Sequence, residues 1–278
     1  MEAKANVCII GLGTIGFPTA LHISKYHKVT GYDIDPKKVK AASDYFFATT
    51  EWSEIPESSV YVVCVNTWWR NGKADMSAVE LVCQKIAETT TNHPLVSIES
   101  TVAVGECRRI YEDIFKKQIN MANCPHRLWE LGRLSPEDMK NYGVKQIRVL
   151  GAIDEESAKR AEEFYQSIQV PLKLVSPIET SEMSKIVENS YRHVEIAFAE
   201  EVALICEKHG LNFSAIREAC NTLKRDKEGW QVQIMEVRDG IGGTCLPKDI
   251  EYLNSLGNPT ELLKGAIETD KRYRRHLQ

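Results

Sequence analysis

Three features that the sequence lacks narrow the classes of protein to which it can belong. Its eight cysteines include no C-x-x-C pair, so neither a zinc knuckle nor a disulfide framework is indicated. No apolar run approaches the ~20 residues of a membrane-spanning helix, and VCIIGLG is too short and glycine-broken for a signal peptide. A net charge of -4 gives no basic field for nucleic acid or an anionic membrane. We expect a cytoplasmic protein with reduced thiols, no metal centre, and neither nucleic-acid nor membrane partners.

The N-terminal stretch has the pattern of a strand, a helix and a second strand. NVCIIG leads into GLGTIG, then into FPTALHISKY and KVTGYDID. Gly11 would permit a tight turn, Gly13 would let the backbone approach a pyrophosphate, and Gly16 would allow close helix–strand packing. Asp33 would accept hydrogen bonds from a ribose hydroxyl and oppose a 2′-phosphate, which favours NAD over NADP. A glycine turn without a cofactor is the alternative.

Further strand-like runs occur at 60–65, at 94–99, around INMANC and at 146–151, with helical patterns between them. This alternation predicts an α/β fold with a Rossmann-like, doubly wound parallel sheet. We place this NAD-binding domain at residues 1–176. Ligands of such sheets bind beyond the carboxyl ends of the strands, so chemistry is expected in the loops NTWWRNGKAD, STVAVG and CPHRLWE.

Residues 177–278 are predicted to form a second, α-helical domain. Ser176 can cap a helix that begins at Pro177, and the helical pattern continues to about residue 209. Apolar residues such as Ile186 and Phe198 lie on more than one side of this helix. We therefore expect it to lie inside a homodimer, so that the second domain is a dimerisation domain.

Two groups of polar residues are candidates for chemistry. Lys185 and Asn189 are spaced i, i+4 on the long helix and share one face, although spacing alone favours a solvated face. Cys245 lies in the glycine-rich stretch GIGGTCLPKDI, where Lys248 and Asp249 follow it. A neighbouring cation can lower the pKa of a thiol, which favours a nucleophile. A buried structural cysteine, as expected for most of the other thiols, is the alternative.

Near the C-terminus, the sequence has a basic cluster formed by Lys271, Arg272, Arg274 and Arg275. We interpret the cluster as a cationic helix end that complements the helix dipole. Contact with an anionic ligand is the alternative.

Taken in order, the motifs resemble those of the nucleotide-sugar 6-dehydrogenases, which include UDP-glucose, GDP-mannose and UDP-N-acetylmannosamine dehydrogenases. The matching stretches are GLGTIG, GYDID, Asn66-Thr67 with Asp75-Met76-Ser77, STVAVG, Pro125 to Glu130, S-K-x-x-E-N-S-Y at 184–191 and GGTCLPKD at 242–249. They cover nearly the whole chain. GGTCLPKD is the most specific, because a Rossmann fold alone would not predict it.

The resemblance implies a four-electron oxidation. An alcohol carbon gives a hydride to NAD, the Cys245 thiolate adds to the aldehyde, and a second hydride leaves to give a thioester that water hydrolyses. Lys185 and Asn189 match positions that hold charge on the sugar oxygen, and Asp249 matches a carboxylate that handles protons. The positions implied at the cofactor and catalytic water are Gly11, Gly13, Thr14, Ile15, Gly16, Asp33, Thr67, Thr101 and Glu130. The implied partner is a sugar nucleotide or related small molecule.

Three departures from the family pattern leave alternatives open. His126 replaces the family's glutamate, and it could serve as a base or mark the loss of thioester hydrolysis. The lead-in at 236–240 carries charges in place of rigid prolines. The family's second Rossmann-like domain, which holds the substrate nucleotide, has no counterpart, so a separate subunit could supply it. The alternatives are a two-electron alcohol dehydrogenase and a catalytically retired NAD-binding interaction protein.

Overall fold

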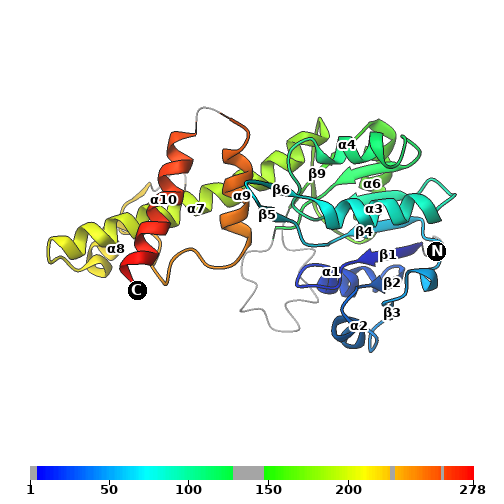
Figure 1. The fold of residues 1–278 in the computed structure, drawn as a ribbon, viewed down its shortest axis with the longest axis horizontal. Coiled ribbons are helices and arrows are strands. Elements are labelled where there is room, and N and C mark those ends of the chain that lie inside the picture. The colour runs from blue at the N-terminus through cyan, green and yellow to red at the C-terminus, as the bar shows by residue number, and fades with distance from the viewer. Residues whose placement is uncertain (1–4, 128–146, 226–228, 258–259) are drawn as a thin grey trace. The chain divides into compact units, whose positions relative to one another are not determined.

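The computed structural model describes residues 5–127, 147–225, 229–257 and 260–278 (Figure 1). The chain divides into two compact units within the long helix α7 (Ile178–Lys208). Residues 1–70 and 74–185 form what we call the sheet unit. Residues 71–73 and 186–278 form the helical unit. The boundary expected at residue 176 from the sequence falls just before α7, whereas the compact units divide between residues 185 and 186.

An eight-stranded sheet forms the centre of the sheet unit. Its strands are β1 (Asn6–Ile10), β2 (Lys28–Tyr32), β3 (Phe47–Thr49), β4 (Val60–Val63), β7 (Leu95–Ile98), β8 (Asn120–Asn123), β9 (Arg148–Ala152) and β10 (Leu172–Val175). Across the sheet they follow the order β3-β2-β1-β4-β7-β8-β9-β10. From β1, the chain adds β2 and β3 on one side of β1. It then crosses to the other side, where β4 lies next to β1 and the later strands follow. The predicted Rossmann-like, doubly wound fold is confirmed, and its switch point lies between β1 and β4.

One neighbouring pair departs from the expected parallel sheet. β8 and β9 pair antiparallel, through Ala122 with Ala152 and Asn123 with Gly151. The other neighbouring strands of this sheet pair parallel. A buried apolar run looks the same in either direction, so periodicity could not reveal this reversal.

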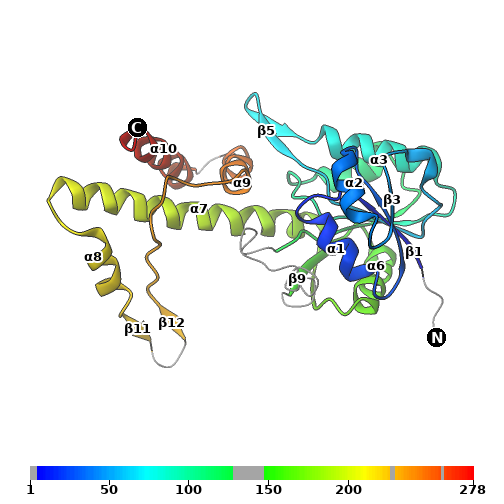
Figure 2. The same ribbon diagram turned by 90° about the horizontal axis from the view of Figure 1, so that it is seen from below.

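Helices cover both faces of the sheet. They are α1 (Gly16–Ile23), α2 (Pro36–Ala42), α3 (Ser77–Thr89), α4 (Glu106–Asp113) and α6 (Glu155–Ser167). The same unit contains a short 3-10 helix (Trp52–Glu54). The strands β5 (Trp68–Arg70) and β6 (Lys73–Asp75) form a separate small ribbon. α1 and α6 share a face, where His22 Nε2 lies 2.6 Å from the Ile168 carbonyl oxygen, and α3 lies across the sheet from α6 (Figure 2).

The central strands β1, β4 and β7 form because their side chains are mostly apolar on both faces. β4 and β7 are buried at every position, and Ile9, Val62 and Leu95 belong to one continuous core with residues of α1 and α6. Continuous burial of this kind is typical of strands covered by helices on both sides. The core fixes the six parallel strands from β3 to β8 so that their carboxyl ends lie along one edge of the sheet.

The helical unit contains most of α7, followed by α8 (Phe213–Cys220), β11 (Lys224–Arg225), β12 (Trp230–Gln231), α9 (Cys245–Asn254) and α10 (Glu261–His276). Ala197, Ile250 and Ala266 form the centre of its apolar core, which joins α7, α9 and α10. The predicted long helix is confirmed, with 31 residues. It ends where Gly210 adopts a φ of +64°, and Leu211 N–H reaches back to the Cys206 carbonyl at 2.8 Å. This pattern is a Schellman motif, which glycine favours.

Candidate functional site

The GLGTIG turn connects β1 to α1, and its glycines meet different surroundings. Gly11 has a φ of +91°, and a Cβ there would lie 2.7 Å from the Cys64 carbonyl oxygen. A Cβ on Gly16 would lie 1.7 Å from the Gly11 carbonyl oxygen. Both positions therefore require glycine for the packing of the turn itself. At Gly13 the nearest atom is Lys38 Nζ at 4.0 Å, so the space beside its backbone is open.

The carboxylate of Asp33 is held beside this turn, just after β2. It is 5% exposed, and it accepts hydrogen bonds from Leu12 N–H at 2.7 Å and Asp35 N–H at 2.9 Å. Lys38 Nζ lies 3.4 Å from its Oδ2. The sequence reasoning missed Lys38, although its place in the first turn of α2, five residues after Asp33, was a usable signal. Lys38 adds a cation beside the open space at Gly13.

The loops after β4 and β7 meet at the same edge of the sheet. Thr67 is buried, and its hydroxyl donates a hydrogen bond of 2.6 Å to the Thr101 carbonyl. Ser100 donates a similar bond of 2.6 Å to the Val65 carbonyl. Because β1, β4 and β7 are adjacent, these loops and the glycine turn lie together at the switch point. Thr14 is exposed and Ile15 is half-buried, immediately before α1.

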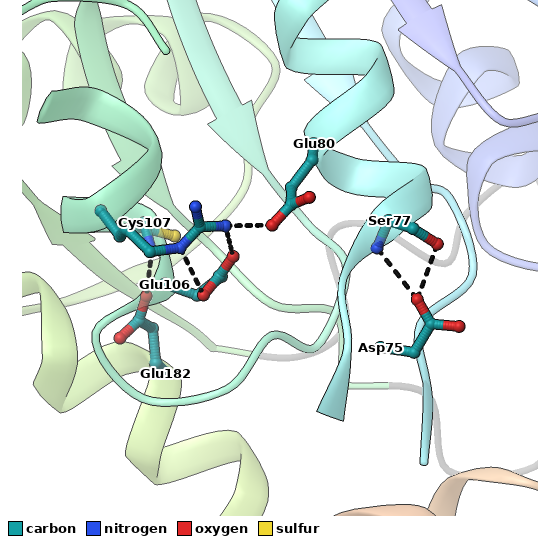
Figure 3. A network of polar contacts seen from close by, with 7 residues as sticks. Asp75, Ser77, Glu80, Glu106, Cys107 and Glu182 are labelled. Carbon is teal, nitrogen blue, oxygen red and sulfur yellow. Dashed lines mark hydrogen bonds and ion pairs between the residues drawn. The ribbon is translucent and has the colours of Figure 1, made fainter. Parts of the chain in front are cut away.

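Glu182 of α7 anchors the end of the STVAVG loop (Figure 3). Its carboxylate accepts hydrogen bonds from Gly105 N–H at 2.6 Å and from Cys107 N–H at 2.8 Å, where α4 begins. Burial raises the pKa of Glu182, while the two backbone donors act against this. The sequence reasoning missed this contact, because Glu182 lies 75 residues from Cys107 and no local pattern connects them.

The same close view shows how α3 and α4 are joined. Asp75 accepts hydrogen bonds from the backbone and hydroxyl of Ser77 at the start of α3, at 3.1 and 2.6 Å. Glu80 of α3 and Glu106 of α4 both pair with Arg109 (Figure 3). These contacts fix the two helices that flank the predicted cofactor loop.

His126 lies in the loop after β8, with 6% of its surface exposed. Its Nε2 is 3.3 Å from the Thr19 hydroxyl of α1. Burial, followed by the charges of Arg148 and Lys185, holds the pKa of His126 well below its usual range. The ring is therefore neutral at neutral pH. Glu130, the other predicted residue of this loop, lies outside the described residues.

A buried ion pair lies deeper in the sheet unit, and sequence reasoning missed it. Glu99, directly after β7, lies 3.0 Å from Arg148 at the start of β9, with side-chain exposures of 0% and 3%. Tyr165 donates a hydrogen bond of 2.8 Å to the other oxygen of Glu99. The pair connects strands that are not neighbours, so no spacing in the sequence could indicate it.

Two predicted catalytic residues of the helical unit, Asn189 of α7 and Asp249 of α9, are in contact. Asp249 is fully buried and accepts hydrogen bonds from Asn189 Nδ2 and from Lys248 Nζ. Lys248 also lies over the ring of Tyr252, 4.2 Å from its centroid. Cys245 is the first residue of α9, one turn before Asp249, and is exposed. Lys185 lies one turn before Asn189 on α7 and belongs to the sheet unit.

Exposure separates Cys245 from most other thiols. All eight cysteines are free. Burial raises the pKa of the Cys8, Cys83 and Cys107 thiols, and it raises the pKa of Cys124 to about 11. Such thiols carry little thiolate and are poor nucleophiles. Cys245 and Cys220 are the exposed ones.

Two kinds of feature are absent from the described residues. No group of three or more His, Cys, Asp or Glu side chains within them is arranged to hold a metal ion. None of the helices in the described ranges is both long enough and apolar enough to cross a membrane.

Comparison with protein families gives two adjoining matches. Residues 40–169 match the NAD binding domain of the UDP-glucose/GDP-mannose dehydrogenase family, and residues 179–272 match its central domain. UDP-N-acetyl-D-mannosamine dehydrogenase of Methanocaldococcus jannaschii is 30% identical over 95% of this chain and 64% of the relative. The Escherichia coli K12 enzyme of the same name is 30% identical, over 96% of this chain and 69% of the relative. The chain thus spans about two thirds of the length of these relatives.

Solved structures agree with these matches. The UDP-D-ManNAc dehydrogenase of Pyrococcus horikoshii has a TM-score of 0.82 and 27% identity, over 96% of this chain and 68% of that one. A 3-hydroxyisobutyrate dehydrogenase of Mycobacterium tuberculosis has a TM-score of 0.71 and 15% identity, over 98% of this chain and 94% of that one. The second likeness shows the fold alone.

Proposed function

We propose, since the chain belongs to the UDP-glucose/GDP-mannose dehydrogenase family, that it oxidises the C6 primary alcohol of a sugar nucleotide to a carboxylate. The named relatives are UDP-N-acetyl-D-mannosamine dehydrogenases, so a UDP-sugar is the first substrate to test. The observation that supports this best is the exposed Cys245, one helical turn from the buried carboxylate of Asp249 that binds Asn189 and Lys248.

The residues of the sheet unit fit NAD, whose nicotinamide accepts a hydride. The open space at Gly13 leaves room for a pyrophosphate at the start of α1, and the first turn of this helix carries no acidic residue to oppose it. Thr14 and Ile15 continue the same turn. The fixed carboxylate of Asp33 suits ribose hydroxyls.

Two further loops extend this cofactor site. Thr67 and Thr101, joined by their hydrogen bond, would line the cofactor from the loops after β4 and β7. Glu130 stays a prediction, because the described residues do not include it. The assignment of all these residues to NAD rests on the open edge of the sheet at the switch point.

Cys245 would carry the covalent chemistry. Its thiolate adds to the aldehyde carbon left by the first oxidation, so that an S–C bond forms and the carbonyl oxygen gains negative charge. Lys185 and the amide of Asn189 would stabilise that charge. Asp249 would accept the proton that the Cys245 thiol loses when it becomes a thiolate. Loss of a hydride from the thiohemiacetal gives a thioester. Water then cleaves the S–C bond and releases the acid and the thiol, so two NADH form for each carboxylate.

The role of His126 is limited by its surroundings. Its low pKa makes it a weak base, and its contact with Thr19 holds it against α1. We therefore assign it to the packing of the cofactor loop rather than to proton transfer during hydrolysis.

We also propose a homodimer formed through α7. Its exposed apolar side chains Val187, Tyr191, Phe198 and Ile205 are 42%, 65%, 54% and 52% exposed and are spaced by four, seven and seven residues. This spacing places them on one face, which a second copy of α7 would cover. Sedimentation at micromolar concentration should show a dimer that Phe198→Asp disrupts, and a wild-type monomer would contradict it. A separate subunit that binds the substrate nucleotide stays a prediction.

The decisive experiment counts NADH formed per sugar nucleotide, with UDP-N-acetyl-D-mannosamine and UDP-glucose as substrates. The wild type should form two, and Cys245→Ser should stop before the acid while keeping its affinity for NAD, because the glycine turn holds the cofactor. Cys220→Ser removes the other exposed thiol and serves as the control. One NADH per substrate, unchanged in Cys245→Ser, would identify a two-electron alcohol dehydrogenase. Binding of NAD without turnover would favour an interaction protein.

Cofactor choice is tested separately by titration. NAD should bind well ahead of NADP, because Asp33 opposes a 2′-phosphate. Lys38→Gln should widen this preference, since it removes the cation beside Asp33. Equal affinities of the wild type for both cofactors would contradict the assignment of Asp33.

A further inference from the structure

The chain that leads to Cys245 has little structure of its own. Residues 232–244 form neither helix nor strand, contain no proline, and include three glycines. Gly240 and Gly243 have φ angles of +91° and +74°, and a Cβ on Gly242 or Gly243 would meet nothing within 4 Å. A segment of this kind has many accessible conformations, so its position must be set by contacts from outside the segment.

Helix α10 supplies those contacts at Ile241. The Asp270 carboxylate accepts a hydrogen bond of 2.8 Å from Ile241 N–H, and the Arg274 guanidinium donates one to the Ile241 carbonyl. Arg274 Nε also lies 3.0 Å from both oxygens of Asp270. Both polar groups of one peptide residue are therefore held by two side chains that are one helical turn apart and bonded to each other.

Gly240 completes the arrangement. A Cβ at this position would lie 2.7 to 2.9 Å from Cγ, Nε and Cζ of Arg274. The Arg274 side chain thus lies directly against the backbone of Gly240, while the Ile241 side chain is 1% exposed. Only glycine permits this close approach together with the positive φ.

The helix that carries the two side chains is itself well fixed. α10 packs through Ala266 onto Ile250 of α9 and Ala197 of α7. Asp270 is 7% exposed. Contacts from a well-packed helix can therefore define the position of the loop.

These contacts change the interpretation of the basic cluster near the C-terminus. Lys271 pairs with Glu268, Arg272 with Glu201 and Arg274 with Asp270. The side chains therefore do more than complement the dipole of their own helix. Arg274 is distinct among these three, because it alone contacts the loop before Cys245.

We propose that Asp270 and Arg274 are positioning residues that fix the cysteine loop through the Ile241 peptide, and so set the place of Cys245 four residues later. The proposal rests on the proposed function only for its catalytic consequence. The physical claim concerns the order of the loop, which can be measured without a substrate.

Amide hydrogen exchange in Arg274→Met tests the physical claim. Exchange in the peptide covering residues 232–245 should rise about tenfold, since one or two hydrogen bonds are lost. Arg272→Met removes an ion pair from the same helix without touching the loop and should leave that exchange unchanged. Unchanged exchange in folded Arg274→Met would overturn the proposal.

If Arg274→Met fails to fold, a second variant can still test the proposal. Gly240→Ala leaves every charge of α10 in place but pushes the loop away from Arg274, and it should raise exchange in the same peptide. If exchange stays at the wild-type level in Gly240→Ala, the proposal is wrong.

Kinetics then separate positioning from general stability. In Arg274→Met, kcat for acid formation should fall by roughly 10- to 100-fold with KM little changed, because the thiol is displaced from its line of attack. Arg274→Lys, which can still donate to the Ile241 carbonyl, should recover part of kcat. A wild type without turnover would refute the proposed function, while the exchange result would still decide the role of the pair.

Discussion

Two buried carboxylates, Glu99 of the sheet unit and Glu200 of the helical unit, have opposite surroundings. In the sheet unit, both oxygens of Glu99 are engaged, one by Arg148 at 3.0 Å and the other by Tyr165 at 2.8 Å. In the helical unit, Glu200 is fully buried, and neither of its oxygens has a hydrogen-bond partner among the described residues. His193, two turns earlier on α7, is also buried, and burial lowers the pKa of its ring.

The difference indicates where stability and where function are concentrated. A buried carboxylate with a cationic partner contributes to a well-ordered core, whereas one without a partner raises the free energy of the folded state. In the helical unit, the buried Glu200 carboxylate raises the free energy of the folded state, and it lies close to Asp270, which holds the cysteine loop. Natural proteins depart from full satisfaction of polar groups mainly at functional sites.

The largest effect is expected at the glycines of the two turns. Gly16→Ala should destabilise the chain by more than about 4 kcal/mol or prevent folding, because a Cβ would lie 1.7 Å from the Gly11 carbonyl oxygen. Gly242→Ala should change stability by less than about 1 kcal/mol, because nothing lies within 4 Å of its Cβ position. Urea unfolding would measure both. Equal costs would remove the distinction between the two turns.

Breaking the ion pair of the sheet unit comes next. Glu99→Gln should cost about 3–5 kcal/mol, because it leaves the Arg148 charge buried without its counter-charge. The double variant Glu99→Leu with Arg148→Met removes both charges and should cost much less. Denaturant unfolding of the three proteins gives the comparison. A cost below about 1 kcal/mol for the single variant would show that Arg148 is not held by Glu99.

Glu200→Gln should increase the free energy of unfolding, and the size of this increase should depend on pH. Burial, and then the charge of Asp270, raises the pKa of Glu200 from 4.5 to about 7. Between these pH values the unfolded chain has lost the proton and the folded chain keeps it, so wild-type stability falls as the pH rises. The variant avoids this loss and should be more stable by up to about 3 kcal/mol at pH 8, with no gain below pH 4.5.

Thermal unfolding at several pH values would measure this gain. Glu201→Gln changes the neighbouring, exposed carboxylate and should show no comparable rise with pH. A gain for Glu200→Gln that is the same at pH 5 and pH 8 would contradict the assigned pKa, and the contrast between the two units would then be lost.

Breaking an exposed ion pair should reduce stability least, and the loss should be about the same in both units. Arg108→Met breaks the pair with Glu179 in the sheet unit, and Arg272→Met breaks the pair with Glu201 in the helical unit. Each should cost less than about 1 kcal/mol, because solvent screens these half-exposed charges. Unfolding in low and high salt would test this. A large cost in one unit alone would mean that burial is not what distinguishes the units.

The sequence by itself determined the features that depend on neighbouring residues. The strand, glycine turn, helix and second strand that end at Asp33 follow from local periodicity and from the backbone freedom of glycine, and the structure has them where they were expected. The order of the motifs indicated the family, and the context of Cys245 set it apart from the cysteines of the core.

Only the tertiary structure decided the contacts that join distant segments. It reversed β9 against β8, buried His126 against Thr19, and brought Glu182 to the start of α4. It also brought Asp270 to the Ile241 peptide, 29 residues earlier in the chain. Such contacts depend on how whole helices and strands pack, and a hydrogen bond leaves no periodic trace in the sequence between its two partners.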